Sequence, residues 1–242
     1  SVGINVNRPE IYFGENTLDY VLVNTKQEEF NYPKGETNVY SRYEGVGGVV
    51  LDSFWKRALY ALKFSDSKIL ISSLVTSKSR IMYNRSIKYI PRQIAPFLIY
   101  DSDPYLVITD AGRLVWMQDA YVSSSMYPYS EPYGGTDINY LRNSVKITID
   151  AYNGQTDFYI VDEKEPIIAA YAKIYPGLFK PFSQMPADLQ QHIRYPKDLF
   201  SVQVAMYNTY HMQDIQVFYN KEDLWELPYE TYDEKEKLME PY

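Results

Sequence analysis

The sequence predicts an α+β fold, with a central antiparallel, meander-like sheet and helices packed around it. Two successive segments, 104–122 and 143–162, each contain two strand-like runs joined by a turn. The turn of the second segment is Asn153-Gly154, a pair typical of tight hairpins. Helical patterns precede and follow both segments. With 242 residues, of which 45% are hydrophobic, the chain can bury a sizeable core as a single domain, 1–242.

Residues 1–101 are expected to mix strands and helices, and residues 102–162 to form the β hairpins. Runs rich in Val, Ile, Leu and Tyr between turn-forming residues indicate where the strands lie. We expect the central sheet to contain 104–109, 114–122, 144–152 and 156–161, with 18–25 added.

The pattern of residues 51–64 is that of an amphipathic helix, which Asp52 or Ser53 caps. Its apolar stripe is expected to consist of Leu51, Trp55, Ala58 and Leu62. A second short helix is expected within 65–74. Together these two helices would form the helical part of the N-terminal segment.

Residues 77–96 also have an amphipathic helical pattern. The apolar face would carry Tyr83, Ile87, Ile90 and Ile94, and the basic face Arg85, Lys88 and Arg92. Pro91 is expected to kink or break the last turn, because it lacks a backbone donor. The basic face is either solvated or directed at anionic lipid headgroups or another domain.

The C-terminal part is expected to be helical over 163–230, followed by an acidic, poorly ordered tail, 231–242. Pro166 suits the first turn of a helix over 165–177, and Pro176-Gly177 suits its end. Further helices are expected within 186–196, over 196–211, with a stripe of Leu199, Val202, Met206 and Tyr210, and within 217–228.

Composition limits the chemistry that this chain can perform. It has no cysteine, which removes disulfides, thiol nucleophiles and zinc–thiolate sites. The net charge of −7 and the acidic C-terminal end argue against a nucleic-acid partner, which requires a dominant basic surface. The glycine run 45–50 precedes a helix but lacks the third glycine and the lysine of phosphate-binding loops. We therefore expect no cofactor.

The two histidines and the carboxylate clusters each have a plain structural explanation. His211 and Asp214 would need a third ligand to hold a metal ion, so we expect no metal site and a local hydrogen bond for His211. Carboxylates cluster at 100–105 and 161–166, where paired acids would suit glycoside hydrolysis or calcium binding. Turns and helix starts use the same residues. The alternative function is thus an enzyme that uses Asp101, Asp103 or Asp162, and whether the chain is an enzyme stays open.

Tyrosine is unusually abundant, with 26 copies in the chain. The segment 121–135, "YVSSSMYPYSEPYGG", concentrates tyrosines between the two hairpins, and we expect an ordered loop packed by its own rings rather than a linker. Tyrosine rings are good contact surfaces for sugars and peptides. The candidate ligand-binding residues are Tyr127, Tyr129, Tyr133, Tyr140 and Arg142.

Several stretches resemble a known family. These are 20–49, "MYPYSEPYGGTDINYLRNSVK" at 126–146, and the run 154–228, which contains "YPKDLF" and ends in "VFYNKEDLWELP". They are similar to uncharacterised protein family 0182, whose members resemble large bacterial membrane proteins with several N-terminal membrane helices and a long extracytoplasmic part.

The resemblance implies that this chain is a piece of the extracytoplasmic part, located at the cell membrane. Its expected partners are the membrane-embedded region and the C-terminal remainder of the same protein, with a glycan or peptide ligand at the cell envelope. The expected function is a binding or protein-interaction module, and the alternative is an enzyme that acts on cell-envelope polymers. The resemblance implies no reaction and no catalytic residues.

Overall fold

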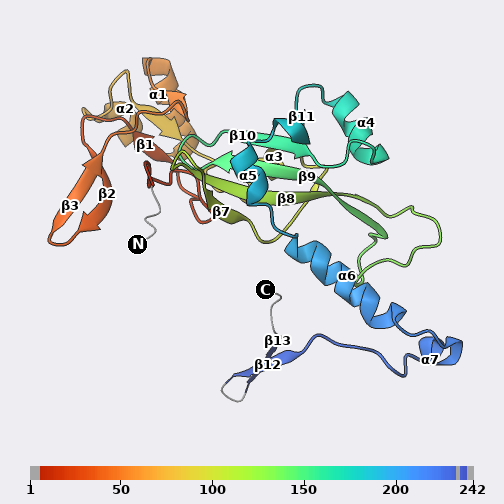
Figure 1. The fold of residues 1–242 in the computed structure, drawn as a ribbon. Coiled ribbons are helices and arrows are strands. Elements are labelled where there is room, and N and C mark those ends of the chain that lie inside the picture. The colour runs from red at the N-terminus through yellow and green to blue at the C-terminus, as the bar shows by residue number, and fades with distance from the viewer. Residues whose placement is uncertain (1–5, 233–234, 239–242) are drawn as a thin grey trace.

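The computed structural model describes residues 6–232 and 235–238. Within these residues, the largest element is a six-stranded sheet in which β6 and β7 follow one another along the same edge of β8 (Figure 1). The remaining order is β8-β9-β10-β11, antiparallel except for the last pair. The strands are β6 (Ile99–Tyr100), β7 (Tyr105–Ile108), β8 (Leu114–Ser124), β9 (Tyr140–Asp150), β10 (Thr156–Ile160) and β11 (Phe179–Pro181).

The predicted α+β class and the four-stranded meander β7 to β10 are confirmed. The turn between β9 and β10 is closed by the Asp150 N–H, which donates to the Gln155 carbonyl at 2.9 Å. Gly154 adopts a φ of +74°, as the hairpin signal requires. Its missing side chain also makes room for Phe13, because a Cβ here would lie 2.5 Å from that ring. The turn thus both closes the hairpin and accepts the N-terminal segment.

The prediction that 18–25 joins the central sheet is wrong. β1 (Val21–Val23) pairs with β5 (Arg80–Met82), which also pairs with β4 (Val49–Val50) in a separate three-stranded sheet. Periodicity identifies a strand but carries no information on its partner. The partner, β5, falls inside a segment that the sequence predicts as helical.

The predicted helix over 77–96 is likewise wrong for most of its length. Its first part is β5, Asn84 then takes a φ of +51°, and only α3 (Ile90–Ile94) is helical. Pro91 lies in the first turn of α3, where no backbone donor is needed. The basic side chains are used inside the fold: Arg85 donates to the carbonyls of Tyr12 and Asp19. The expected lipid-facing or solvated basic helix therefore does not form.

Helices α1 (Phe54–Phe64) and α2 (Lys68–Ile71) confirm the two predicted N-terminal helices, and the Ser53 hydroxyl caps α1. The predicted stripe is wrong in part. Leu51 is buried, but Trp55 and Leu62 are 75% and 78% exposed. The opposite side of α1 packs instead, through Tyr60, Ala61 and Phe64. An α-helix that is apolar on both sides does not reveal from its sequence which side the body covers.

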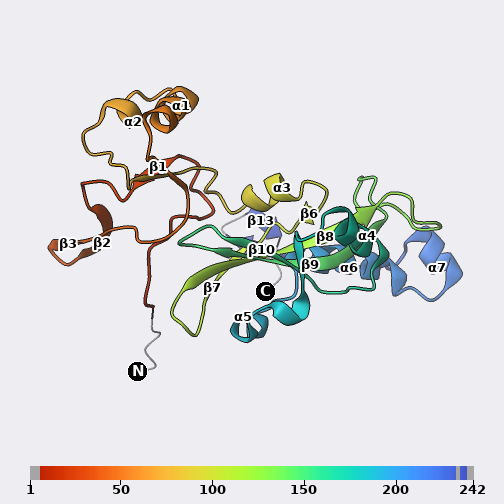
Figure 2. The same ribbon diagram turned by 90° about the horizontal axis from the view of Figure 1, so that it is seen from above.

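The central sheet is covered on both faces (Figure 2). On one face, Val145, Ile147 and Phe158 pack beneath α3 and α4 (Pro166–Ile174). On the other face, Met117 and Tyr159 pack beneath the 3-10 turn Phe182–Gln184 and α5 (Ala187–Gln191). The N-terminal segment joins the first core, because the N–H groups of residues 12 and 13 both donate to the carbonyl of residue 151.

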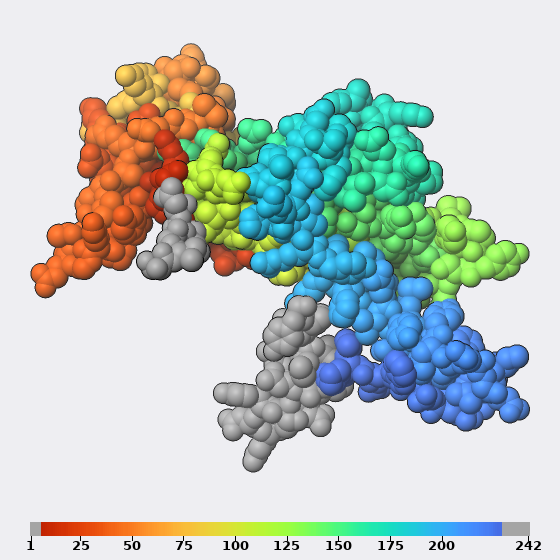
Figure 3. Space-filling view, in the orientation of Figure 1, coloured from red at the N-terminus to blue at the C-terminus, as the bar shows by residue number. Residues whose placement is uncertain are grey.

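Two elements project from this body (Figures 1 and 3). One is the hairpin of β2 (Glu29–Lys34) and β3 (Thr37–Ser41). The other is formed by α6 (Lys197–Tyr210) and α7 (Ile215–Asn220); residues 197–225 are called the α6–α7 arm below. β12 (Tyr229–Tyr232) and β13 (Lys235–Leu238) follow as a hairpin that includes the described part of the predicted acidic tail. The rest of that tail, 233–234 and 239–242, lies outside the described residues.

Candidate functional site

The tyrosine loop, residues 125–139 between β8 and β9, is ordered. The Asn139 side chain makes three of the hydrogen bonds that hold it. The Asn139 amide donates to the carbonyls of Tyr127 at 2.8 Å and Ser130 at 3.2 Å, and its oxygen accepts from the Tyr127 N–H at 3.0 Å. The Ser130 hydroxyl donates back to the Asn139 carbonyl at 2.8 Å. One side chain therefore ties the loop across its width, which supports the expectation of an ordered loop over a linker.

Two of the candidate tyrosines form a stacked pair. The rings of Tyr127 and Tyr140 lie 5.3 Å apart between centroids at an interplanar angle of 17°. The Tyr140 hydroxyl donates to Glu165 at 3.2 Å, and the other carboxylate oxygen of Glu165 caps α4 through the Ile168 N–H. Burial and the Glu165 carboxylate raise the pKa of Tyr140. The pair thus joins the loop to the start of α4.

The other three candidate residues are not part of this ring stack. Arg142 forms an ion pair with Asp162 at 3.2 Å. Tyr133 is partly exposed, and Tyr129 is fully exposed with a φ of +57°. The expectation that the loop is packed by its own rings is therefore correct only for Tyr127 and Tyr140. The loop is held mainly by hydrogen bonds, and the five residues line a surface rather than one pocket.

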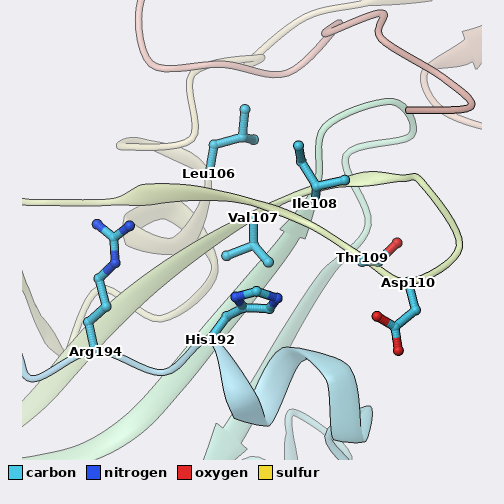
Figure 4. A pocket seen from close by; sticks show the side chains of 7 residues that line it. All are labelled: Leu106, Val107, Ile108, Thr109, Asp110, His192 and Arg194. Atoms are coloured by element: carbon cyan, nitrogen blue, oxygen red, sulfur yellow. The ribbon is translucent and has the colours of Figure 1, made fainter. Parts of the chain in front are cut away.

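A shallow depression of about 490 Å³ lies between β7 and the segment after α5 (Figure 4). Its lining residues are Leu106, Val107, Ile108, Thr109, Asp110, His192 and Arg194. Figure 4 shows His192 facing Val107, with Asp110 near one end and Arg194 near the other. The sequence did not single out this site, because no local motif marks it. Its lining includes one carboxylate, Asp110, whose N–H donates to the Asp188 carboxylate at 3.3 Å.

Two of the three carboxylates named for the enzyme alternative, Asp101 and Asp162, have structural roles. Asp101 is buried and accepts hydrogen bonds from the Tyr121 hydroxyl, the Asp103 N–H at 3.0 Å and the Asp198 N–H at 3.0 Å. Asp162 accepts from the Lys164 N–H at 3.1 Å, in addition to its ion pair with arginine. Turn and helix-start use explains these residues, as the sequence favoured.

A polar network, buried at Lys146 and Asp119 and exposed at Ser102, connects the base of the α6–α7 arm to the central sheet. Lys146 on β9 donates both to the Asp119 carboxylate on β8 and, at 3.3 Å, to the carbonyl of Arg194. Burial raises the pKa of Asp119 although Lys146 opposes the shift. At the first turn of α6, Asp198 accepts from the Ser102 hydroxyl at 2.6 Å. Sequence reasoning missed this network, because its members come from five separate segments.

His211 has the local environment that the sequence favoured. Its ring stacks on Trp225 with centroids 3.8 Å apart, and its Nδ1 lies 3.2 Å from the Tyr207 carbonyl. Asp214 instead caps α7 through the Gln216 N–H at 2.8 Å. Within the described residues, no three His, Asp or Glu side chains are grouped so that they could hold a metal ion.

The glycine run 45–50 is not an open cradle. Arg80 donates to the carbonyls of Val46, Gly47 and Gly48 at 2.5, 2.6 and 3.2 Å. Since these carbonyls are directed at a guanidinium of the same chain, the loop is built around its own cation rather than around a phosphate.

Among the described residues, two exposed apolar surfaces stand out. One is the outer side of α1, and the other covers the α6–α7 arm, in which neither helix has a buried residue. Large exposed apolar patches are typical of interaction sites. None of the described helices combines the length and apolar character needed to cross a membrane.

The fold is of the α+β class, and it carries two exposed apolar surfaces. The chain belongs to the uncharacterised protein family UPF0182, whose family description matches residues 1–242. It is 55% identical over its full length to a UPF0182 protein of Desulforamulus reducens and 54% identical over 99% of its length to one of Pelotomaculum thermopropionicum. It is also 53% identical to a relative from Sulfurovum sp..

The chain spans about a quarter of the length of these relatives, 26% for the first two and 27% for the third. It therefore corresponds to one part of a larger protein. No solved structure gives a significant match to this fold.

Proposed function

We propose that this chain is an interaction module that packs against the rest of its own polypeptide through the α6–α7 arm. One observation carries the proposal: the arm presents large apolar side chains to solvent, on helices in which no residue is fully buried. Exposed residues on the arm are Met206, Tyr207, Tyr210, Ile215 and Tyr219. Aromatic residues and methionine are enriched at the centres of protein interfaces. Because the relatives are nearly four times as long as this chain, the proposed partner is another part of the same polypeptide.

The base of the arm supports this proposal, because it is fixed before any partner binds. Asp198 makes hydrogen bonds to a single loop from its side chain and its backbone. Its carboxylate accepts from the Ser102 N–H at 2.8 Å, and its backbone N–H donates to the Asp101 carboxylate. Arg194, just before the arm, lies over the Tyr105 ring at 4.5 Å. A surface that is already oriented loses less conformational entropy on binding. The arm is thus suited to dock as a preformed element.

The proposal places the module at the cell envelope, on the extracytoplasmic side of the membrane. The support is the membrane character that the family resemblance implies. The absence of cysteine in this chain makes the placement easy to test. A cysteine introduced at the exposed position Glu36, in a full-length protein cleared of other cysteines, should react with a membrane-impermeant maleimide in intact cells. Labelling only after lysis would contradict this placement.

Site-specific photo-crosslinking in the full-length protein tests the docking itself. A benzophenone amino acid at Tyr210 or Tyr219 should form intramolecular crosslinks to peptides from outside these 242 residues, which mass spectrometry identifies. The matched control is the same amino acid at Glu36 in the exposed turn between β2 and β3. Crosslinks that are equally frequent at Glu36 and on the arm would refute docking through the arm.

A second candidate function is glycan or peptide binding on the tyrosine loop. The observation that favours it is Tyr129, whose ring is fully exposed while its backbone is held at a positive φ. Such a conformation is unfavourable for a bulky residue and is often retained at functional positions. Tyr133 and the stacked Tyr127–Tyr140 pair would provide adjacent contact surface, and Arg142 a polar anchor at its edge. Glycan and peptide arrays probed with the purified chain test this function.

A further inference from the structure

The outer side of α1 is an exposed apolar feature that neither the core nor the α6–α7 arm explains. At about 100° per residue, Phe54, Trp55, Leu59 and Leu62 fall on the side opposite Tyr60 and Phe64, which pack against the body. The four outer side chains are 64–78% exposed. We call Phe54, Trp55, Leu59 and Leu62, together with the exposed Ile71 of the adjoining α2, the α1 outer face.

The α1 outer face lies at one end of the molecule. Figures 1 and 2 show α1 and α2 side by side at the extremity opposite α7, and in Figure 3 they form the upper left corner. In the described part of the chain, no element packs over this side. The α1 outer face is therefore accessible to an extended surface, such as another protein or a membrane.

The charges around the face indicate what kind of surface that is. α1 contains Lys56, Arg57 and Lys63 and no acidic residue. Residues 51–100 contain nine lysines and arginines and two acids, Asp52 and Asp66, although the whole chain carries a net charge of −7. On α1, Lys56 pairs with Asp52 at 2.8 Å and Lys63 lies over the Tyr83 ring at 4.0 Å, but both side chains stay exposed, and the segment keeps an excess of positive charge. The apolar face is thus bordered by positive charge.

We propose that the α1 outer face rests on a lipid bilayer that carries anionic headgroups. Helices that lie in a membrane interface combine Trp, Phe and Leu on one side with basic residues at its border, as α1 does. Tryptophan prefers the interface, where its ring is in the apolar zone and its N–H reaches water or headgroups. A protein partner with acidic residues would also be attracted by these basic side chains. The experiments below therefore distinguish binding to lipid from binding to protein.

The proposal replaces the lipid role that the sequence suggested for Arg85 and Lys88. Those side chains hold the N-terminal segment: Arg85 bonds to two carbonyls, and Lys88 pairs with Glu15 at 2.8 Å. The inference does not depend on the arm, because α1 and the arm are at opposite ends of the molecule. Failure of one proposal therefore leaves the other standing.

The three tryptophans of the chain allow a direct experiment. In the variant Trp116→Phe/Trp225→Phe, Trp55 is the sole tryptophan and reports on the α1 outer face. With vesicles of phosphatidylcholine and phosphatidylglycerol, we expect its emission to shift to the blue and to be quenched by brominated acyl chains. The matched control is Trp55→Phe/Trp116→Phe, in which Trp225 reports on the arm and should show neither effect. Circular dichroism confirms that both variants are folded.

Vesicle co-sedimentation measures the contribution of the face to affinity. Leu59→Ser/Leu62→Ser should weaken binding by about tenfold or more, because two exposed leucines no longer enter the lipid. The matched control Ile215→Ser/Tyr219→Ser, at equally exposed positions of the arm, should bind like the parent chain. Replacing phosphatidylglycerol with phosphatidylcholine, or adding salt, should reduce binding.

Three results would overturn the proposal. The first is that Trp55 emission does not respond to any vesicle. The second is equal quenching of Trp55 and Trp225, which would indicate non-specific adsorption. The third is a dimer in analytical ultracentrifugation that Leu59→Ser/Leu62→Ser abolishes while vesicle binding is unchanged, which would assign the face to a second copy of this chain.

Discussion

Lys146 donates a hydrogen bond to Asp119 from the neighbouring strand, and both side chains are about 95% buried, at 6% and 5% exposure. The Asn143 amide donates to the same carboxylate at 2.8 Å. Lys146→Met should lower the free energy of unfolding by roughly 3–5 kcal/mol, because it leaves a buried carboxylate without its cation. Urea denaturation followed by circular dichroism measures the change.

The pH dependence of this variant provides its control. Burial already raises the pKa of Asp119, and loss of the cation raises it further. A carboxyl whose folded pKa exceeds its unfolded pKa binds a proton more tightly in the native state, so stability rises as the pH falls. The deficit of Lys146→Met should therefore be smaller in mild acid than at neutral pH. The double variant Asp119→Leu/Lys146→Met should recover most of the loss, and a deficit as large as that of the single variant would contradict the assignment.

Alkaline pH should destabilise the chain, because many tyrosines are held neutral in the fold. The hydrogen bond to Asp66 raises the pKa of Tyr20 to about 12, and burial raises that of Tyr60 to about 12. Within the described residues the pKa is raised for Tyr12, Tyr20, Tyr43, Tyr60, Tyr100, Tyr105, Tyr121, Tyr140 and Tyr159.

The sign follows from the unfolded reference of about 10 for tyrosine. The contribution of these protonated tyrosines to the free energy of unfolding is complete below about pH 10. It is lost as the pH rises through their pKa values in the folded state. Denaturant midpoints should therefore fall steeply above about pH 10, while tyrosinate absorbance in the native protein lags behind that of the unfolded chain. Tyr20→Phe should reduce the pH slope. A midpoint that does not change with alkaline pH would be inconsistent with these environments.

Gly48→Ala should lower the free energy of unfolding by roughly 2–4 kcal/mol. Gly48 has a φ of +70°, and a Cβ would lie 2.5 Å from the Ile81 carbonyl oxygen. Gly134→Ala is the matched control, since Gly134 has a φ of +56° with nothing within 4 Å. The control should cost about 1 kcal/mol, from backbone strain alone. Equal losses for both variants, measured by thermal unfolding, would show that the close approach to β5 is unimportant.

Tyr129→Asn should raise the free energy of unfolding by about 0.5 kcal/mol, because asparagine tolerates positive φ better than tyrosine does. The same change should remove any glycan or peptide that the tyrosine loop binds. Tyr133→Asn, at a residue with negative φ, should give no such gain in stability. If Tyr129→Asn is destabilising, the exposed ring has a packing role that its exposure does not suggest.

The meander and most helix positions were predictable because they depend on local signals. Alternating strands around Asn153-Gly154, the Ser53 cap and the proline that opens α4 each determine structure within a few residues. The plain roles of His211 and of the carboxylates were also predictable, since caps and turns use those residues routinely.

The misassigned elements depend on contacts between distant segments. Residues 77–96 satisfy a helical pattern, yet β5 pairs with strands from two earlier segments, and tertiary pairing overrides local preference. The ion pair of Lys146 and Asp119 joins two strands in register, which a single sequence does not reveal. Trp55 and Leu62, on the outer side of α1, were assigned to the packed stripe because apolar periodicity does not reveal whether another element covers a helix face.

The covering of both faces of the central sheet has a consequence for the order in which the chain folds during synthesis. The N-terminal segment docks on residue 151, and β11, the only parallel strand of the sheet, follows α4. The first core cannot close until residues up to Phe179 have left the ribosome, and the second cannot close until α5 has emerged. Such long sequence separations slow folding and leave apolar surface exposed on the nascent chain. Until then, the first half is stabilised only by its own smaller core around Leu51, Ile69 and Ile81.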